Sequence, residues 1–489
     1  MNIFFTTLGG FILTSRFQPY HRVWGMLFLG WFIAYFDRTI TGPVVTWMID
    51  NDVAFLAASD NPYALGGLLG SLFFAGYMLT QFPGGYFGDK YGYRNMVLIS
   101  IFWAGITTLL TGLFSGLLIF IALRVLTGLG EGAFYSNDRS LIAQVTPPKK
   151  IGLGMGIVIS GLSVGLTAGL IGTLYLIEIA RDFLGQDAWK SPFLILGTST
   201  ILIGFLMKKY IPVTPEEAGK ASVKKSILYL GGYSFVFLAI IMAIYYVTDL
   251  MKLSEAMIAA IFTILALLFV AYIYKSKPEV RPVLKNRNLM FLYISAIPIM
   301  WHLWFYGFWS VSIVQDFGGG GLLMAALIAS FNAFAGLIGF PIGGAISDRV
   351  AHKKNGRRNI LFILTAALTV SIFIFAAYVM SGNQSPVVMS IILFVSGLLF
   401  FAVQSIQHAM IADLSPEEHR GSAFGMWNLI AEIGALLSPV ISGVLRDSTG
   451  SWGAPLLLDG ALIGISCIFI IMIGTRLSRS SDKSIKQSA

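Results

Sequence analysis

The sequence predicts an all-α membrane protein with fourteen transmembrane helices, arranged as two related six-helix bundles with a further helix pair inserted between them. Of its 489 residues, 56% are hydrophobic and only 12% are charged, and the mean hydropathy is +0.78. Soluble domains carry about 25% charged residues. Fourteen apolar segments of about 20 residues are each long enough to cross the hydrocarbon core of a bilayer as a helix.

These segments divide the chain into three parts, 1–210, 211–285 and 286–489. The first bundle holds six segments, at 22–46, 63–84, 96–115, 117–142, 152–178 and 192–207. The inserted pair lies at 227–247 and 257–274, and the second bundle holds 289–314, 320–346, 359–380, 386–411, 422–445 and 455–475. Because the inserted pair contains no charged residue, we expect it to pack on the outside of the bundle, away from any pathway.

The basic residues predict that both termini are cytoplasmic. In that orientation 26 of the 33 Lys and Arg residues fall on the cytoplasmic side and four fall outside. Cytoplasmic loops carry this excess in membrane proteins. The apolar run within residues 1–16 is too short to span, and no cleavage pattern follows it, so we interpret this segment as a cytoplasmic lead-in and not as a signal peptide. We expect a multi-pass protein of the cell (inner) membrane.

Several function classes are not favoured by the sequence. The net charge of +9 comes from clusters between the spans, where charge sets topology, and does not indicate a nucleic-acid partner. The single cysteine, Cys467, excludes an intramolecular disulfide and a cysteine-based metal site. Glycine-rich stretches at 152–156 and 161–172 lie inside a predicted span with no preceding strand, which favours helix packing over a nucleotide loop. We expect no enzyme activity, no metal and no cofactor.

An internal repeat relates the two bundles. The turn after the second span, Gly84–Lys90, recurs 259 residues later as Gly343–Arg349. The loop that begins Thr146-Pro147 recurs 269 residues later as Ser415-Pro416. Parallel repeats with a substrate site near the bilayer midplane, at the interface between the repeats, are typical of transporters.

Four charged residues lie inside predicted spans: Asp37 and Arg38 in the first, and Arg124 and Glu131 in the fourth. At about 2.5 to 3.5 kcal/mol each, they oppose insertion by about 10 kcal/mol unless partners or a watery cavity offset the cost. Arg124 and Glu131 are seven residues apart and therefore share one helix face. Such charges indicate a solute or proton pathway. The alternative is an internal salt bridge that only holds the two helices together.

The segment Gly85–Arg94 carries a family resemblance. Its sequence, GYFGDKYGYR, resembles the signature loop of the major facilitator superfamily, Gly-x-x-x-Asp-Arg/Lys-x-Gly-x-Arg/Lys, with every defined position filled. It lies in a predicted cytoplasmic loop and recurs in degraded form at Gly344–Arg349. The resemblance implies the two-bundle fold of that superfamily.

Within the superfamily, the chain resembles the anion:cation symporters, which include hexuronate, galactonate and phthalate permeases and the vesicular glutamate and sialic acid carriers. The similar pieces are Tyr35–Arg38, Gly76–Gly85, and Arg124 with Glu131. Spinster-type carriers of lysolipids share the Asp-Arg and Gly-Glu pairs. The chain departs from the symporters in its inserted helix pair, since they usually have twelve spans, and at Tyr135–Asp138, where a Phe-Pro pair is common.

The symporter resemblance implies roles for the four charges. Arg38 and Arg124 would bind the anionic group of the substrate, and Asp37 and Glu131 would exchange the coupled proton. The chemistry agrees, because guanidinium stays charged and matches the geometry of a carboxylate. A carboxyl group beside it in a closed cavity can titrate near physiological pH.

Glu432 is a third candidate for proton coupling. It shares a helix face with Asn428, a candidate for substrate binding, because the two are four residues apart. The aromatic seventh span offers Tyr306 as a substrate contact, whereas His302 is more typical of a packed or hydrogen-bonded residue than of a proton relay. Further polar candidates in the second bundle are Asn332, Gln404, Gln407 and His408.

We interpret Asp89 and Arg94 of the signature loop, with Asp348 in the repeated turn, as a cytoplasmic gate. The pair Asp138-Arg139, near the inner end of the fourth span, is expected to act at a gate or an interface.

The sequence therefore predicts a secondary active transporter of a small organic anion, such as a sugar acid or another carboxylate. It would be coupled to protons, work by alternating access and be monomeric in the lipid bilayer. The alternatives are a spinster-like carrier of an amphiphilic or lipid-derived solute and a transporter-like solute sensor. The short C-terminal tail, SRSSDKSIKQSA, offers no recognisable signalling surface for the sensor.

Overall fold

The computed structural model describes residues 18–147, 150–213, 222–318, 320–382, 384–416 and 419–474. Within these ranges the regular secondary structure is entirely helical, which confirms the all-α prediction for this part of the chain. The predicted lead-in at residues 1–16 and the C-terminal tail lie outside the described residues. Helices satisfy their own backbone hydrogen bonds, which is what an apolar chain in lipid requires.

The first half holds α2 (Pro19–Asp50), α3 (Ala54–Ala57), α4 (Pro62–Tyr91), α5 (Tyr93–Thr111), α6 (Leu117–Glu131), α7 (Phe134–Val145), α8 (Ile151–Leu184), η2 (Gly185–Lys190) and α9 (Ser191–Tyr210). The middle holds α11 (Val223–Leu250), α12 (Glu255–Ser276), η3 (Pro278–Val280) and α13 (Arg281–Lys285). The second half holds α14 (Arg287–Gly318), α15 (Leu322–Phe334), α16 (Gly336–Val350), α17 (Gly356–Met380), α18 (Pro386–Leu414), α19 (Arg420–Thr449) and α20 (Gly453–Ile471).

Twelve segments of the described residues are long and apolar enough to cross a membrane. Helix α2, which has 32 residues and carries Asp37 and Arg38 in its interior, is not among the twelve. One of the twelve, Leu153–Tyr210, contains both α8 and α9. Each segment predicted from the sequence falls on a helix or on a helix pair. Two predicted segments are interrupted in the structure. The segment at 117–142 is divided into α6 and α7, and the segment at 320–346 is divided into α15 and α16.

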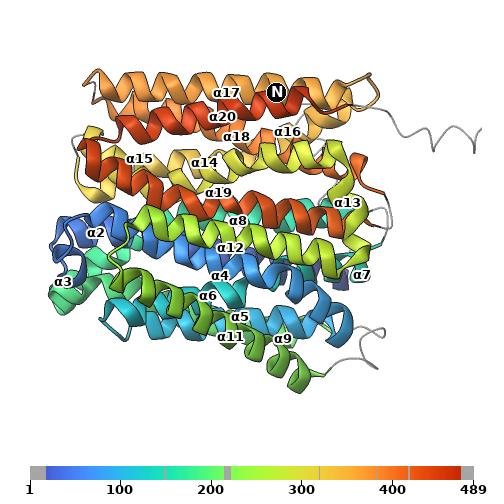
Figure 1. The fold of residues 1–489 in the computed structure, drawn as a ribbon, viewed down its shortest axis with the longest axis horizontal. Helices are drawn as coiled ribbons and strands as arrows, with labels where there is room; N and C mark the ends of the chain where they lie inside the picture. The colour runs from blue at the N-terminus through green and yellow to red at the C-terminus, as the bar shows by residue number, and fades with distance from the viewer. Residues whose placement is uncertain are drawn as a thin grey trace, which may run out of the picture.

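The two halves lie side by side as separate layers of long helices (Figure 1). Helices α2, α4 and α8 of the first half pack against α14, α19 and α15 of the second. These six helices form the interface between the halves, and they bring the charged segment of α2 against the second half.

Helices α11 and α12, in the middle of the chain, lie on the outside of this core (Figure 1). Only 22% of the most apolar window of α11 and 28% of that of α12 is buried, compared with 83% for α4. Helix α11 packs on α4, α5 and α6, whereas α12 contacts α4 of the first half and α19 of the second. Helix α12 therefore lies over the junction between the halves.

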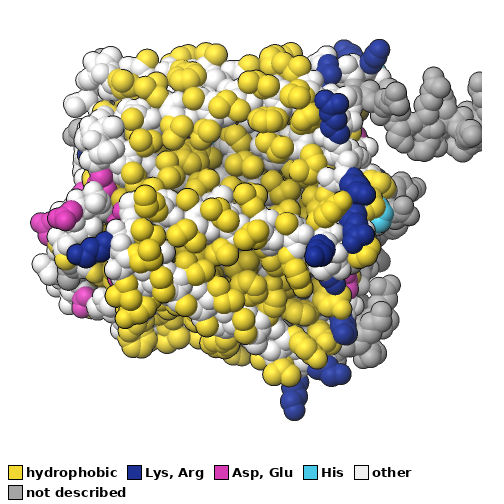
Figure 2. All heavy atoms as spheres, viewed as in Figure 1, with side chains coloured by type: hydrophobic (Ala, Val, Ile, Leu, Met, Phe, Trp, Pro, Cys, Tyr) yellow, Lys and Arg dark blue, Asp and Glu magenta, His cyan; other side chains and the backbone are white. Residues whose placement is uncertain are grey.

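The two ends of the helix layers differ in charge. Figure 2 shows a broad hydrophobic surface along the helices, with Lys and Arg side chains at one end and most of the visible Asp and Glu side chains at the other. The basic end holds α13 and the last turn of α9, with Lys208 and Lys209; the acidic end holds α3 (Figure 1).

At the acidic end the halves meet backbone against backbone. Gly67 of α4 faces the backbone of Pro439 in α19 so closely that a Cβ atom would overlap it. Gly42 of α2 faces the backbone of Phe308 in α14 in the same way. Small residues allow membrane helices to approach this closely.

A cross-half cap reinforces this closure. Asp447 of α19 accepts hydrogen bonds from the backbone N–H of Ala64, at 2.7 Å, and of Tyr63, at 3.4 Å, in the first turn of α4. The N-cap residue of α4 itself, Asn61, makes no side-chain cap. The second half therefore supplies the acceptor that the first turn of a helix needs.

Gly67→Leu should hold the acidic end open, because the new side chain overlaps the backbone of α19. The reporter is the thiol introduced by Ser312→Cys, at a position only 2% exposed, in a chain whose single native cysteine is removed by Cys467→Ser. We expect its labelling by a membrane-impermeant thiol reagent to accelerate at least about tenfold as the open population grows. Gly25→Leu is the control, since its Cβ meets open space; equal labelling in the two variants would contradict the closure.

Candidate functional site

The four charged residues predicted to line a pathway lie together between α2 and α6. Their exposed fractions are 1% for Asp37, 4% for Arg38, 1% for Arg124 and 2% for Glu131. Arg38 Nε lies 2.7 Å from Glu131 Oε2, and Arg124 Nη1 lies 2.7 Å from Asp37 Oδ1. The adjacent residues on α2 thus bind partners two turns apart on α6, and each charge is compensated within the first half.

The pair of Arg124 and Asp37 makes several further contacts. Arg124 Nη2 also donates to the Asp37 carbonyl oxygen at 3.1 Å, and the Thr108 hydroxyl donates to the second carboxylate oxygen of Asp37. The Arg124 guanidinium lies 4.9 Å from the centre of the Phe73 ring. This arrangement agrees with the alternative of a salt bridge that holds helices together, although Arg124 Nε, like Arg38 Nη1, is buried without a hydrogen-bond partner.

The pair of Arg38 and Glu131 is incomplete. Arg38 Nη1 and Glu131 Oε1 are buried and have no hydrogen-bond partner. The Arg38 guanidinium lies between two rings, 4.7 Å from the centre of Tyr35 and 4.2 Å from that of Tyr77. Aromatic faces stabilise a desolvated cation without consuming its hydrogen-bond donors. Arg38 therefore keeps a donor available for an anion.

The second half presents a carboxylate to the same arginine. Glu432 of α19 is 3% exposed, has no partner for its Oε2 atom, and interacts electrostatically with Arg38. Asn428, one turn earlier, is 6% exposed and has an unpartnered amide nitrogen. The structure thus brings the predicted residues Arg38, Glu432 and Asn428 to the interface helices of the two halves, with Glu131 paired to Arg38 from α6.

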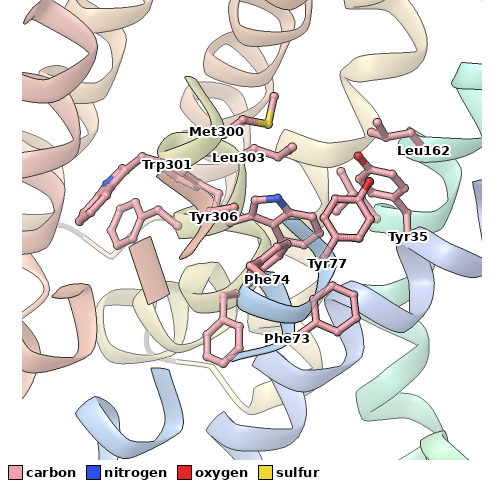
Figure 3. Close-up of a cluster of buried hydrophobic side chains, with 14 of the residues drawn as sticks. Tyr35, Phe73, Phe74, Tyr77, Leu162, Met300, Trp301, Leu303 and Tyr306 are labelled. Atoms are coloured by element: carbon pink, nitrogen blue, oxygen red, sulfur yellow. The ribbon is translucent and has the colours of Figure 1, made fainter. Parts of the chain in front are cut away.

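An aromatic cluster borders Arg38 at the interface. Figure 3 shows Tyr35 and Tyr77 near one another, with Phe73 and Phe74 beside them and Met300, Trp301 and Leu303 of α14 on the other side. Trp304 of α14 stacks on Tyr35, with ring centres 5.9 Å apart, and packs on Phe74 at 4.6 Å. The Trp304 indole N–H is buried without a partner. The aromatic cluster therefore offers an unpartnered hydrogen-bond donor as well as apolar surface.

A small cavity connects the two carboxylates of the cluster. It is lined by Asp37 and Glu131 together with Ser100 of α5 and Thr200 of α9, and its volume is about 10 Å³. That volume holds about one water molecule beside the two carboxyl groups.

The Tyr306 ring packs on residues of the second half. It packs on His302, with centres 4.6 Å apart, and on Phe375 of α17 at 6.3 Å, both within the second half. The Tyr306 hydroxyl is buried without a partner. His302 is not isolated, since its Nδ1 atom lies 2.7 Å from Asp459 Oδ2 of α20. The expectation of a hydrogen-bonded His302 is therefore met.

Two of the other polar candidates in the second half have their hydrogen-bond partners in that same half. Asn332 donates to the Leu393 carbonyl at 3.2 Å, and Gln407 donates to Ser295 at 3.3 Å. Oε1 of Gln404 and Nε2 of His408 are buried without partners.

The predicted gate residues lie at the basic end, each in contact with its own half. Asp89 accepts from the Tyr93 hydroxyl at 2.6 Å. Arg94 donates to the carbonyls of Ile211, at 2.6 Å, and Lys208, at 2.7 Å, at the end of α9.

In the second half, Arg357 of α17 lies 3.2 Å from Asp348 and also pairs with Asp413 of α18. The repeated turn is therefore tied to two neighbouring helices, as the signature loop is tied to α9.

Asp138 and Arg139 of α7 contact the first helix. The Trp31 indole N–H donates to Asp138 Oδ2 at 2.6 Å, and the Arg139 guanidinium lies 5.2 Å from the Trp31 ring centre. Arg139 Nε is 3.8 Å from Asp138 Oδ1. The pair thus joins α7 to α2.

Sequence reasoning did not single out Tyr35, Tyr77, Trp304 or Asp459 as site residues. A partial signal exists for Tyr35, which lies three residues before Arg38 and so shares its helix face. Trp304 and Asp459 belong to other helices, and no spacing in the sequence relates them to their partners.

The family model described as the Major Facilitator Superfamily matches residues 27–405 and 353–488. The chain belongs to the major facilitator superfamily. It is accordingly a multi-pass membrane transporter of this superfamily and not an enzyme.

Two relatives share nearly its full length. A probable sulfoacetate transporter of Cupriavidus necator is 24% identical over 474 residues, covering 96% of this chain and 97% of the relative. A probable galactarate/D-glucarate transporter of Bacillus subtilis is 24% identical over 467 residues, covering 92% and 90%. Both names specify organic acids, which matches the resemblance to the anion:cation symporters within the superfamily.

A solved structure supports the fold. The crystal structure of a bacterial homologue of the human lysosomal transporter Spinster, in an inward-facing and occupied conformation, superimposes with a TM-score of 0.67 at 14% identity. The match covers 94% of this chain and 97% of that one. The superfamily fold therefore extends over almost the whole chain.

Arg124→Gln should destabilise the protein, because it leaves the Asp37 carboxylate buried without its guanidinium partner. Removing one member of a buried pair costs about 3–5 kcal/mol, and thermal unfolding in detergent measures the loss. The double variant Arg124→Gln with Asp37→Asn should recover a large part of it, since no unpaired charge remains. Arg181→Gln, in an exposed pair with Glu178, is the control and should change stability by less than about 1 kcal/mol. Wild-type melting of Arg124→Gln would disprove the structural role.

Proposed function

We propose that this protein is a secondary active transporter that moves a small organic anion together with protons by alternating access. The observation that carries the proposal is the state of Arg38. Its guanidinium is buried at the interface of the halves and paired with Glu131, yet it keeps an unpartnered Nη1 donor. A permanent cation with a free donor at this position is suited to bind an anionic group.

The substrate class follows from Arg38 and is supported by the relatives. Sulfoacetate, galactarate and D-glucarate each carry a carboxylate, the group that a guanidinium binds with two parallel hydrogen bonds. The amide of Asn428 and the indole N–H of Trp304 supply further donors without partners. We assign Arg124 to the support of Asp37, in place of the direct substrate contact expected from the resemblance, and leave Tyr306 as a secondary substrate contact.

Proton coupling follows from competition for Arg38. A substrate carboxylate that binds the guanidinium takes the place of the Glu131 carboxylate. A carboxylate left buried without a partner is costly, and protonation removes that cost. Substrate binding and protonation of Glu131 are then linked. The cavity shared with Asp37 provides space for a water molecule through which a proton can move between the two carboxyl groups.

Alternating access is supported by the location of Glu432. It belongs to the second half and interacts with Arg38 of the first. When the halves separate, Arg38 loses this carboxylate and keeps Glu131, so the net charge around the arginine depends on the conformation. Glu432 is therefore a second acid whose protonation is tied to the transport cycle.

We further propose the topology predicted from the sequence. Fourteen spans follow if α2 crosses the membrane, as its 32 residues allow, and if α8 and α9 cross separately. The basic end would be cytoplasmic, with both termini there, in accordance with the excess of Lys and Arg in cytoplasmic loops. The halves would be 1–210 and 286–489, with the inserted pair between them, in a monomer of the cell (inner) membrane. Asp89, Arg94 and Asp348 would form its cytoplasmic gate.

Purified protein in liposomes should accumulate at least one of labelled D-glucarate, galactarate and sulfoacetate when an inward proton gradient is imposed. Liposomes with the gradient collapsed by a protonophore are the control and should show only equilibration. Failure of all three anions would contradict the proposed substrate class. Accumulation of a lysolipid in their place would favour the amphiphile carrier, and binding without transport would favour a sensor.

Glu131→Gln should abolish accumulation driven by the proton gradient but preserve counterflow exchange of the same anion, because a neutral side chain releases Arg38 without protonation. Loss of gradient-driven uptake by at least about tenfold corresponds to about 1.4 kcal/mol of coupling. Glu178→Gln, on the exposed face of α8, is the matched control. Loss of both activities would assign Glu131 to folding or to substrate binding.

A further inference from the structure

A column of stacked groups runs along one face of α2 from Arg38 to Arg139. The Arg38 guanidinium lies 4.7 Å from the Tyr35 ring centre. Tyr35 stacks on Trp31, with centres 5.4 Å apart and an interplanar angle of 23°, and Trp31 is 5.2 Å from the Arg139 guanidinium. Two permanent cations are thus held at the ends of an aromatic stack that lies along residues 31 to 38 of α2, a length of about 10 Å along the helix axis.

The column contacts the second half at its Arg38 end and interacts with it electrostatically at its Arg139 end. At the Arg38 end, Tyr35 stacks on Trp304 of α14. At the Arg139 end, the guanidinium interacts electrostatically with His408 of α18, whose Nε2 atom is buried without a partner. The column therefore follows the interface between the halves, where the proposed transport path lies.

Arg139 retains a free donor, as Arg38 does. Its Nη2 atom is buried and has no hydrogen-bond partner, and its Nη1 atom makes one long bond of 3.5 Å to the Met155 carbonyl. Asp138 Oδ1 is near but lies 3.8 Å from Nε, and the other oxygen of Asp138 accepts the Trp31 indole N–H. The nearby carboxylate lowers the affinity of Arg139 for an anion, but it does not occupy the Nη donors.

Two glycines of interface helices border open space nearer to the basic end than Arg38. On α8, Ser163 packs closely on Gly336 of α16, whereas Gly156, two turns nearer the basic end on the same face, borders open space. On α19, Gly425 lies two turns from Glu432 on the same face and also borders open space. The Arg139 side chain is 19% exposed, so an anion from the basic end reaches Arg139 before Arg38.

We propose that Arg139 forms a second, weaker binding site for the carboxylate or sulfonate group of the transported anion, between Arg38 and the basic end. The proposal rests on the proposed function, because it assumes that Arg38 holds the anion at the central site. The anion passes from one guanidinium to the other past the edges of the Tyr35 and Trp31 rings, because ring edges carry positive potential and the ring faces are stacked. The aromatic rings keep both cations in place without using their hydrogen-bond donors.

The first test measures transport from each side in inside-out and right-side-out membrane vesicles, with labelled D-glucarate and sulfoacetate as probes. Arg139→Gln should raise the KM for the anion offered at the basic end about tenfold, the value of one charge-assisted hydrogen bond, and change the KM at the acidic end less than about twofold. Lys150→Gln removes one charge from the same end and is the matched control, expected to leave both KM values unchanged. Equal changes at both ends in Arg139→Gln would indicate a structural role and overturn the proposal.

The second test measures equilibrium binding of the same probes by calorimetry. Arg38→Gln should retain weak binding that is lost in the double variant Arg38→Gln with Arg139→Gln. Absence of residual binding in Arg38→Gln, with binding intact in the wild type, would also overturn the proposal. If the wild-type protein neither binds nor transports either probe, the proposed function fails and not the second site alone.

Discussion

Arg38 places a permanent positive charge in the middle of a helix bundle, and its surroundings are arranged around the need to compensate that charge. A guanidinium cannot be neutralised by losing a proton at physiological pH. Neighbouring groups must therefore compensate it, and they are the Glu131 carboxylate, the faces of Tyr35 and Tyr77, and Glu432 across the interface. The pairing of Arg124 with Asp37 serves this arrangement, because it fixes α2 against α6 and so fixes where Arg38 lies.

The two ends of the interface are built with different chemistry. At the acidic end, Gly42 and Gly67 let the helix backbones touch, and Asp447 caps the first turn of α4. At the basic end, Gly156 and Gly425 border open space. Two turns away on the same helix faces, Ser163 and Glu432 interact with the other half. The same residue type thus marks a close contact at one end and a gap at the other. What differs is the backbone that faces the glycine, and this can be read only from the assembled halves.

Most of the fold could be predicted from the sequence, because a membrane helix is specified by the length and polarity of a single segment. Each predicted segment falls on a helix or a helix pair, and Gly85 and Gly344, which the repeat relates, both lie within helices, α4 and α16. The grouping of Asp37, Arg38, Arg124 and Glu131 was also predictable, since unpaired charges in a bilayer must find one another. The pairing of each arginine with a particular acid was not predictable, because it depends on how far α6 is shifted along α2.

The contacts between the halves could not be predicted from the sequence either, because they depend on how the helices of one half pack against those of the other. Trp304 and Tyr306 are two residues apart on α14 and so point to different sides of it. One meets Tyr35 of the first half and the other packs on His302 inside the second. Composition gives no reason to choose Trp304, and only the packing of α14 on α2 makes the choice. The partnership of His302 with Asp459 of α20 has the same origin.

Helix α12 has a mechanical consequence for the whole molecule. It contacts α4 of the first half and α19 of the second, and most of its surface faces outward. Any movement that draws α4 away from α19 must slide or bend α12 against at least one of them. In the proposed alternating-access movement, lipids around α12 would be displaced, so the thickness and stiffness of the surrounding bilayer would contribute to the energy of opening. Helix α12 would then act as an elastic restraint on the separation of the halves.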